Sequence, residues 1–339
     1  SFPTPRCATE YGVQSLPLRS TMSHYIPADE QRFLSGNYTH RQHKPGGTYA
    51  MLAQAFSHFP LPKRCTAANI SDWSRCFPSV GGASAESAIY ASDFVDRFAY
   101  YTQMHQALTY ERETTHYLRY RGRLTPSGEG HTMCALYWQL NDVWAAPTWS
   151  SIDWDLRWKP AHYMAGRFFA DFVLVMFLSE NNVLDAYAVN GGTKDLKDVT
   201  IQIDVLDYSN GFNSVDSVIH TLTLPAGSST PIQVSTIEAS LKSLSLSIEE
   251  LVFSGVARHD GKQLGYTTTT MNDKFYHVNL DSTGTVTVKS LKQLTETEYE
   301  LTIETSRVAP FVWIEIKRDD FLGFLDDNAF TMVEKSRTL

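Results

Sequence analysis

The sequence predicts a mixed fold, in which strands and helices alternate over the first half and strands alone fill the second half. The change falls near residue 171. Before it, short apolar segments without alternation are followed by helical stretches, which is the order that builds a parallel sheet or barrel. After it, apolar residues recur at every second position, which is the period of half-buried strands in a sandwich. We therefore expect part of an α/β sheet or barrel at residues 1–171, followed by β-sandwich domains.

Two strands and three longer helices are expected in the first half. The strands are the apolar segments 6–11 and 132–140, which are bounded by loops. The helices are expected at about residues 48–59, 90–121 and 159–170. The charged part of the second helix, residues 109–121, is interpreted as an outer helix with a solvated face. Two strands are too few for a closed eight-stranded barrel, which needs about 250 residues, so we expect another segment to supply the missing strands.

The second half is expected to form two sandwich domains, at residues 172–255 and 256–339, the second of them incomplete at its C-terminus. Apolar and polar residues alternate along 199–205 and along 299–303. Turn sequences rich in Gly, Asn and Pro recur between such stretches. They lie at 190–192, 210–211, 225–227 and 282–284. This spacing is typical of small β-sandwich domains.

Composition excludes some function classes and leaves others open. The chain has 339 residues, 42% of them hydrophobic, so it can bury a sizeable core. A formal charge of −8 argues against a nucleic-acid partner, because such proteins need a basic face. The longest apolar run, 168–178, is too short to span a bilayer and contains Asp171, so no membrane partner is expected. An aromatic content of 12% suits sugar binding, but it suits a large core equally well.

Sequons and one pair of cysteines indicate passage through the secretory pathway. Asn37 and Asn69 each begin an N-x-S/T sequon and are candidate glycosylation sites. Cys65 and Cys76 bracket a polar stretch that also holds Asn69. A loop disulfide between these two cysteines is therefore expected in an oxidising compartment.

Neither the other two cysteines nor a nearby histidine pair is expected to form a chemical site. Cys7 and Cys134 lie in the apolar strand segments, without CxxC or paired-His spacing around them, and we expect buried free thiols. His40 and His43 have a spacing that could bind a metal ion, but a clear third ligand is missing. No metal site is therefore expected.

Two strand ends carry the residues of greatest chemical interest. A single carboxylate, Glu10, stands at the end of the first strand, where barrel enzymes place catalytic groups. A glutamate there is more often a capping or salt-bridged residue, so its position alone does not decide its role. The second strand ends in a loop with Trp138 and Trp144. Tryptophan at such a site can stack against a pyranose ring, and the plainer alternative is loop packing.

Six segments together resemble a known family. They are CATEYGVQSLP (7–17), RQHKPGG (41–47), MLAQAFSHFPLP (51–62), TMCALYWQLNDVWAAPTWSSIDW (132–154), KPAHYMAGRFF (159–169) and APFVWIEI (309–316). In this order they resemble the animal lysosomal β-mannosidases of glycoside hydrolase family 2, over nearly the whole chain. Related galactosidases and glucuronidases share SEYG-type strands, whereas YWQLND together with RQHxxGG points to the mannosidase branch.

The resemblance implies a fold and a set of site residues. Residues 1–171 would be the C-terminal part of a catalytic (β/α)8 TIM barrel, followed by all-β immunoglobulin-like sandwich domains. Glu10 matches the family's nucleophile on the seventh barrel strand. Trp138 matches a tryptophan at the end of the eighth strand that lines the mannose site. Gln14, Asn141 and Trp144 lie in the same motifs and are expected near the substrate.

The resemblance also implies a reaction that this chain completes only with help. The family's acid/base glutamate belongs to an Asn-Glu pair on the fourth barrel strand, and this sequence has no such motif. A retaining glycosidase needs that second carboxylate, about 5 to 5.5 Å from the nucleophile, to protonate the leaving oxygen. We therefore expect a lysosomal or secreted exo-β-mannosidase without a cofactor. It would act on glycoprotein-derived oligosaccharides, and an N-terminal segment of the same enzyme would supply the acid/base residue. The rival hypothesis is a non-catalytic binding or structural glycoprotein that kept the fold.

Overall fold

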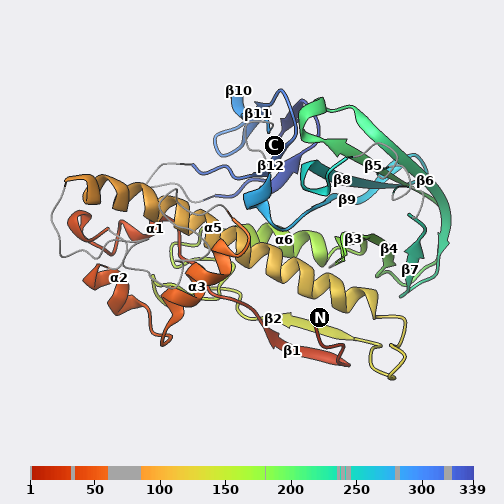
Figure 1. The fold of residues 1–339 in the computed structure, drawn as a ribbon, viewed down its shortest axis with the longest axis horizontal. Helices are drawn as coiled ribbons and strands as arrows, with labels where there is room; N and C mark the ends of the chain where they lie inside the picture. The colour runs from red at the N-terminus through yellow and green to blue at the C-terminus, as the bar shows by residue number, and fades with distance from the viewer. Residues whose placement is uncertain are drawn as a thin grey trace.

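Helices gather in the first half of the chain and strands in the second half (Figure 1). The computed structural model describes residues 2–31, 35–59, 85–179, 181–234, 237, 241, 246–278, 283–316 and 323–339, except for the side chains of 85–94. The expected Cys65–Cys76 disulfide and the sequon at Asn69 lie outside the described residues. Within these ranges, no helix is long and apolar enough to cross a membrane.

In the first half, two short parallel strands lie beside a set of helices. Strand β1 (Cys7–Tyr11) pairs in parallel with β2 (Cys134–Tyr137). The helices are α1 (Arg19–Met22), α2 (Gly36–Arg41), α3 (Gly47–Phe56), α5 (Ala85–Arg119) and α6 (Pro160–Phe168), with a 3-10 turn η1 (Ala28–Glu30). Both expected strands and all three expected helices are therefore confirmed, although β2 is shorter than the expected strand.

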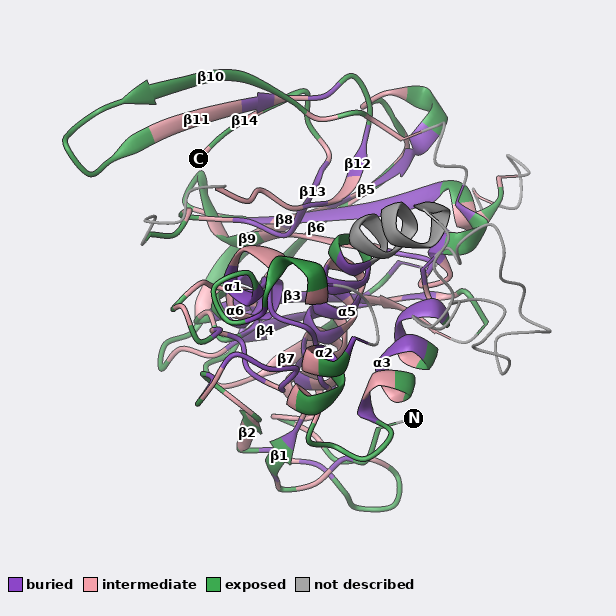
Figure 2. Ribbon diagram, turned by 90° about the vertical axis from the view of Figure 1, so that its left-hand side faces the viewer, coloured by how far each residue is buried: buried purple, intermediate pink, exposed green. Residues whose placement is uncertain are grey.

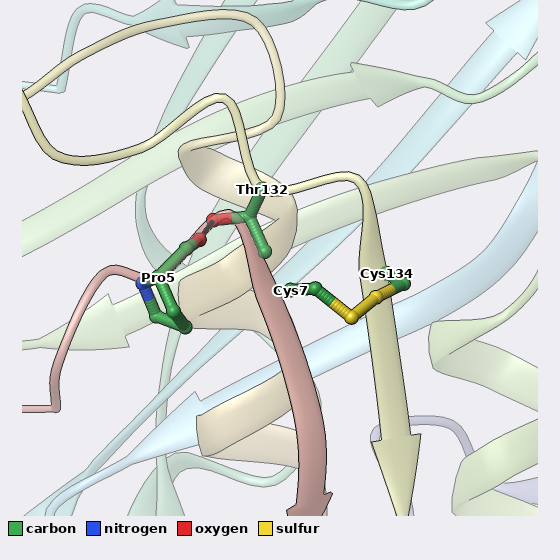
Figure 3. Close-up of a disulfide and its surroundings, with 4 residues drawn as sticks. All are labelled: Pro5, Cys7, Thr132 and Cys134. Carbon is green, nitrogen blue, oxygen red and sulfur yellow. Dashed lines mark hydrogen bonds between the residues drawn. A yellow bond between two sulfur atoms is a disulfide. The ribbon is translucent and has the colours of Figure 1, made fainter.

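Cys7 and Cys134 are joined by a disulfide (Figure 3). The parallel register places them opposite each other, with their Cα atoms 4.6 Å apart. At the same end of the two strands, Thr132 Oγ1 donates a hydrogen bond of 2.6 Å to the carbonyl of Pro5. The expectation of two buried free thiols is wrong, because it treated each cysteine within its own segment and ignored that the two strands are neighbours.

Helix α5 is the central element of the first half, with β1 and β2 on one side and the strands of the second half on the other (Figure 1). One end packs against α1, α2 and α3 through a core that includes Met51, Leu52 and Phe98. The other end packs against α6 through Tyr110 and Phe168. All of residues 109–121 are buried or half-buried. The expectation of a fully solvated face there is wrong. The charged residues are half-buried, and Arg112, whose side chain is 40% exposed, forms an ion pair with Asp273 of the second half.

The second half begins with two packed antiparallel sheets. The first sheet has the order β3 (Phe172–Leu178), β4 (Leu184–Asn190), β7 (Ser229–Ile232). The second has the order β6 (Ser214–Leu224), β5 (Leu196–Asp207), β8 (Leu251–His259), β9 (Lys262–Met271). Alternate residues of these strands face inward and form one core, with Leu174, Ile201 and Phe253 among them. The period of two in the sequence therefore marks a sandwich, as expected.

The boundary expected between residues 255 and 256 falls inside a strand. Strand β8 runs through both positions, and β9 pairs with it from Lys262 to Met271. The first sandwich therefore continues to Met271. The expected limits 172–255 and 256–339 do not hold, because the hydrogen-bonding partner of β8 lies beyond them.

The chain ends in a smaller all-β unit. Its strands are β10 (Thr287–Gln293), β11 (Tyr299–Glu304) and β14 (Ser336–Thr338) in one sheet, and β12 (Ala309–Val312) and β13 (Phe330–Met332) in another. The 3-10 turns η2 (Tyr208–Asn210), η3 (Ile248–Glu250) and η4 (Phe275–His277) complete the second half. The two small sheets share a core that includes Ile303 and Phe330. Strand β10 is exposed along its whole length, at the outer edge of the molecule (Figure 2).

Candidate active site

Glu10 and Trp138 lie at the carboxyl ends of the two neighbouring parallel strands. The N–H of Trp138 donates a hydrogen bond of 2.8 Å to the carbonyl of Tyr11, so the residue after Glu10 is tied directly to Trp138. Glu10 is exposed, and half of the surface of Trp138 is accessible, at 50%. The sequence-predicted carboxylate and aromatic ring are thus brought to one edge of the sheet, where both are open to a ligand.

Gly12 lies close against the backbone of Trp138, at the carboxyl ends of the two strands. A Cβ atom added at Gly12 would collide with the carbonyl oxygen of Trp138 and would lie 2.6 Å from the hydroxyl oxygen of Tyr110. Only glycine fits between these two groups without moving the backbone. The glycine that follows the Glu10 strand therefore permits close packing as well as a turn.

Helix α5 presents buried polar side chains at four-residue intervals to the chain that follows Glu10. We call these residues the α5 polar stripe: Thr102, Gln106, Tyr110 and Thr114. Thr102 Oγ1 accepts a hydrogen bond of 3.1 Å from the N–H of Leu16. Gln106 Nε2 donates one of 2.9 Å to the carbonyl of Val13, and its Oε1 accepts one of 2.9 Å from Ser15 Oγ. The segment after β1 is irregular, and the stripe supplies the hydrogen bonds that a neighbouring strand would otherwise provide.

Tyr110 connects this stripe to the segment that follows β2, residues 138–154, which we call the tryptophan loop. Its hydroxyl lies 2.7 Å from the carbonyl oxygen of Trp138 and 2.7 Å from that of Trp149. Thr114, one turn further along α5, shares a hydrogen bond of 2.5 Å with the hydroxyl of Tyr11. Sequence reasoning missed both residues, because nothing distinguishes a buried tyrosine that packs from one that binds backbone carbonyls.

The segment RQHKPGG packs against the loop that follows β2. The imidazole of His43 lies 4.7 Å from the ring centre of Trp144, and the guanidinium of Arg41 lies 5.4 Å from it. Arg41 also donates a hydrogen bond of 2.7 Å to the carbonyl of Ala145. Trp144 is thus half-buried among protein groups, whereas Trp138 keeps an accessible face.

Gln14 and Asn141 differ in their accessibility. Gln14 is buried, and its Nε2 donates to Gln42 Oε1 and to the carbonyl of Pro147, both at 3.1 Å. Its side chain therefore joins the RQHKPGG segment to the tryptophan loop. Asn141 is exposed, and its Nδ2 donates to the carbonyl of Asp142 at 3.0 Å. Its side-chain oxygen points to no protein donor among the described hydrogen bonds, so it is open to a ligand.

A buried lysine contacts the segment that follows Glu10. Lys159 is fully buried, and its Nζ donates a hydrogen bond of 3.2 Å to Ser15 Oγ. Burial lowers the pKa of Lys159, and the carboxylates of Asp142 and Asp153 act in the opposite direction. Burial raises the pKa of Asp153, which accepts a hydrogen bond of 2.6 Å from Thr21 Oγ1. The buried ammonium is thus hydrogen-bonded to Ser15, and the nearby carboxylates of Asp142 and Asp153 favour its charged form.

One sizeable cavity lies away from these residues. Its volume is about 980 Å³, and it lies between α5, the first sandwich and the C-terminal unit, where Arg112, Arg119 and Glu111 are among its lining residues. Neither Glu10 nor Trp138 lines it. Within the described ranges, no group of three or more His, Cys, Asp or Glu side chains could hold a metal ion.

Comparison with known proteins identifies the relatives of this chain. A family model described as an Ig-fold domain, Ig_mannosidase, matches residues 278–339. The whole chain is 36% identical to a probable β-mannosidase of Caenorhabditis elegans and covers 36% of that protein. It is 32% identical, again over the whole chain, to the β-mannosidase of Capra hircus and covers 35% of it. The sequence relatives of this chain are β-mannosidases. The resemblance to the C-terminal portion of these glycoside hydrolases is therefore confirmed, as is an Ig-like fold at the end of the chain.

Two solved structures share the fold of this chain. The β-D-mannosidase of Dictyoglomus thermophilum superposes on 98% of the chain with a TM-score of 0.71 at 18% identity, and the match covers 35% of that chain. An exo-β-D-glucosaminidase, CsxA, superposes on 96% of the chain with a TM-score of 0.61 at 15% identity and a coverage of 38%. At these identities the superpositions show the shared fold alone. The chain spans about a third of the length of the β-mannosidases it matches.

Proposed function

We propose that the polypeptide containing this chain is a retaining exo-β-mannosidase in which Glu10 is the nucleophile. The observation that carries the proposal is the pairing of strand ends. An exposed carboxylate near the end of β1 and an exposed tryptophan directly after β2 lie at the carboxyl ends of paired strands, in a chain similar to β-mannosidases. In the first step, a carboxylate oxygen of Glu10 attacks the anomeric carbon while the bond to the leaving oxygen breaks. Water then hydrolyses the glycosyl ester, so the configuration is retained.

The remaining strands and the acid/base carboxylate would come from an N-terminal segment of the same enzyme. β1 and β2 are neighbouring parallel strands with helices packed beside them, as in a (β/α)8 barrel. Apolar side chains around β2 are open to water, with Met133 exposed to 75% and Val143 to 76%. Such a surface favours coverage by further protein. A barrel completed in this way would place a second carboxylate across from Glu10.

The proposed substrate is the terminal non-reducing β-D-mannose of glycoprotein-derived oligosaccharides. Trp138 offers its accessible face for stacking against the pyranose ring. Asn141 offers an exposed amide for hydrogen bonding to a sugar hydroxyl. Gln14 and Trp144 would act indirectly, by holding the loop that presents these groups. A lysosomal or secreted location is supported by the Cys7–Cys134 disulfide, because such bonds persist in oxidising compartments.

The stereochemistry of hydrolysis tests this proposal. The full-length polypeptide should hydrolyse an aryl β-mannoside, and NMR of the first product should show the β anomer before mutarotation. The α anomer as first product would contradict a glycosyl–enzyme intermediate. Binding of mannosides without any hydrolysis would instead favour the rival function, a non-catalytic glycoprotein that retains the fold.

A further inference from the structure

We propose that Tyr110 is a positioning residue of the active site, whose hydroxyl holds the backbone carbonyls of Trp138 and Trp149 and so fixes the direction in which the Trp138 indole meets a sugar. The inference rests on the proposed function, because it assigns Trp138 to the substrate site. Tyr110 is a buried residue of α5, so it would act on the active site without contacting the substrate.

The placement of Tyr110 within the α5 polar stripe is the first support. Residues four apart lie on one face of a helix, so the stripe is directed at a single target. A buried polar side chain costs free energy unless it is hydrogen-bonded, and every member of the stripe has a partner. The partners of Thr102 and Gln106 lie in the segment after Glu10, and those of Tyr110 lie in the tryptophan loop. The stripe thus fixes both halves of the site to one rigid element.

The geometry around Trp138 is the second support. Its N–H is held by the carbonyl of Tyr11, 2.8 Å away, and its carbonyl by the hydroxyl of Tyr110, 2.7 Å away. Both peptide groups that flank its Cα are therefore hydrogen-bonded, which fixes the direction of its Cα–Cβ bond. Trp149 is fixed by the same hydroxyl, and its carbonyl also accepts a hydrogen bond of 3.0 Å from the N–H of Gln139.

The chemistry of the Tyr110 hydroxyl suits a positioning role. Tyr110 is fully buried, and burial raises the pKa of its hydroxyl, so the group stays protonated and remains a donor. Its ring packs against Tyr137 with centres 5.2 Å apart and against Tyr11 with centres 6.3 Å apart. Removal of the hydroxyl alone would keep these ring contacts. It would remove the donor that lies 2.7 Å from the carbonyl oxygen of Trp138 and 2.7 Å from that of Trp149.

The test compares Tyr110→Phe with Tyr117→Phe in the full-length polypeptide. Tyr117 is a matched control on the same helix: its ring also packs on Tyr11, 5.4 Å between centres, but its hydroxyl donates to Glu113 within α5. Tyr110→Phe should raise KM for an aryl β-mannoside about tenfold with a smaller change in kcat, since one buried hydrogen bond is worth about that factor. Tyr117→Phe should stay within about twofold of the wild type.

A second readout separates this inference from the proposed function. Hydrogen exchange of the backbone amides at 138–151 should quicken in Tyr110→Phe and not in Tyr117→Phe. Equal exchange and equal KM in the two variants of an active enzyme would overturn the positioning role and leave the proposed function intact. If the wild-type enzyme hydrolyses no mannoside, the proposed function is contradicted. Hydrogen exchange in the two variants would still test whether Tyr110 fixes residues 138–151. If Tyr110→Phe does not fold, 3-fluorotyrosine is placed at position 110 or at position 117 instead. KM should then change with the substitution at 110 and not with that at 117.

Discussion

Gly12 lies close against the backbone of Trp138, and its substitution tests the packing of the site. Gly12→Ala places a methyl group against the carbonyl oxygen of Trp138 and the hydroxyl of Tyr110. We expect a loss of about 1–3 kcal/mol in the free energy of unfolding, as for other overpacked sites. The control is Gly166→Ala in α6, where an added Cβ meets nothing within 4 Å. That variant should be neutral or stabilised by up to about 1 kcal/mol. Urea unfolding measures both, and equal stabilities would contradict the close approach.

The sequence predicts the site residues at strand ends, but not the buried residues that position them. Glu10 and Trp138 can be found because each stands at the end of an apolar segment, and the two segments are paired strands. Tyr110 and Lys159 cannot, because their importance depends on which backbone groups come near them in the fold. A buried lysine next to a proline in the sequence carries no sign that it will bind Ser15.

Helix α5 carries histidines whose protonation destabilises the folded state. Burial lowers the pKa of His105 to about 4 and that of His116 to about 4, against about 6.5 for an unfolded chain. Between these values the unfolded state binds more protons, so stability is lost as the pH falls from about 6.5 to 4. Urea unfolding at pH 7 and at pH 5 should show this loss. The double variant His105→Gln, His116→Gln should lose less stability over the same interval, and an unchanged pH dependence would contradict the assignment.

The pairing of β1 with β2 is reinforced by a covalent bond. The Cys7–Cys134 disulfide joins residues 127 apart in sequence. The chain-entropy account gives about 4–5 kcal/mol for loops of that length. Replacing both cysteines by alanine should lower the free energy of unfolding by about that amount. Peptide mapping without reduction should recover the two strands as one linked peptide, and recovery of both thiols in free form would contradict the bond.

Local patterns predicted most elements and missed how they are oriented. The period of two identified the sandwich strands, and apolar segments identified β1 and β2. The charged end of α5 suggested a face in water, whereas the structure surrounds that end with α6, β3 and other elements. Charge alone does not show whether a helix faces solvent or a partner. The boundary expected at residue 255 failed for a similar reason, since β8 gains its neighbour β9 only through pairing beyond that point.

The whole molecule presents an open sheet edge next to the proposed site. Apolar residues around β2 are exposed, among them Met133, Leu136 and Val143. We predict that residues 1–339 expressed alone aggregate on size-exclusion chromatography and do not hydrolyse an aryl β-mannoside, because unpaired strand edges and apolar faces associate in water. The full-length polypeptide is the control. A monodisperse and active product from residues 1–339 would contradict the need for a further segment.

Covalent trapping tests directly whether Glu10 is the nucleophile. The full-length polypeptide is incubated with a 2-fluoro β-mannoside that carries a good leaving group, and its peptides are analysed by mass spectrometry. We expect one labelled peptide with the sugar on Glu10, and no label in Glu10→Gln. That variant should fold normally but lose nearly all turnover, because an amide cannot attack the anomeric carbon. A label on any other residue, or wild-type turnover in Glu10→Gln, would contradict this assignment.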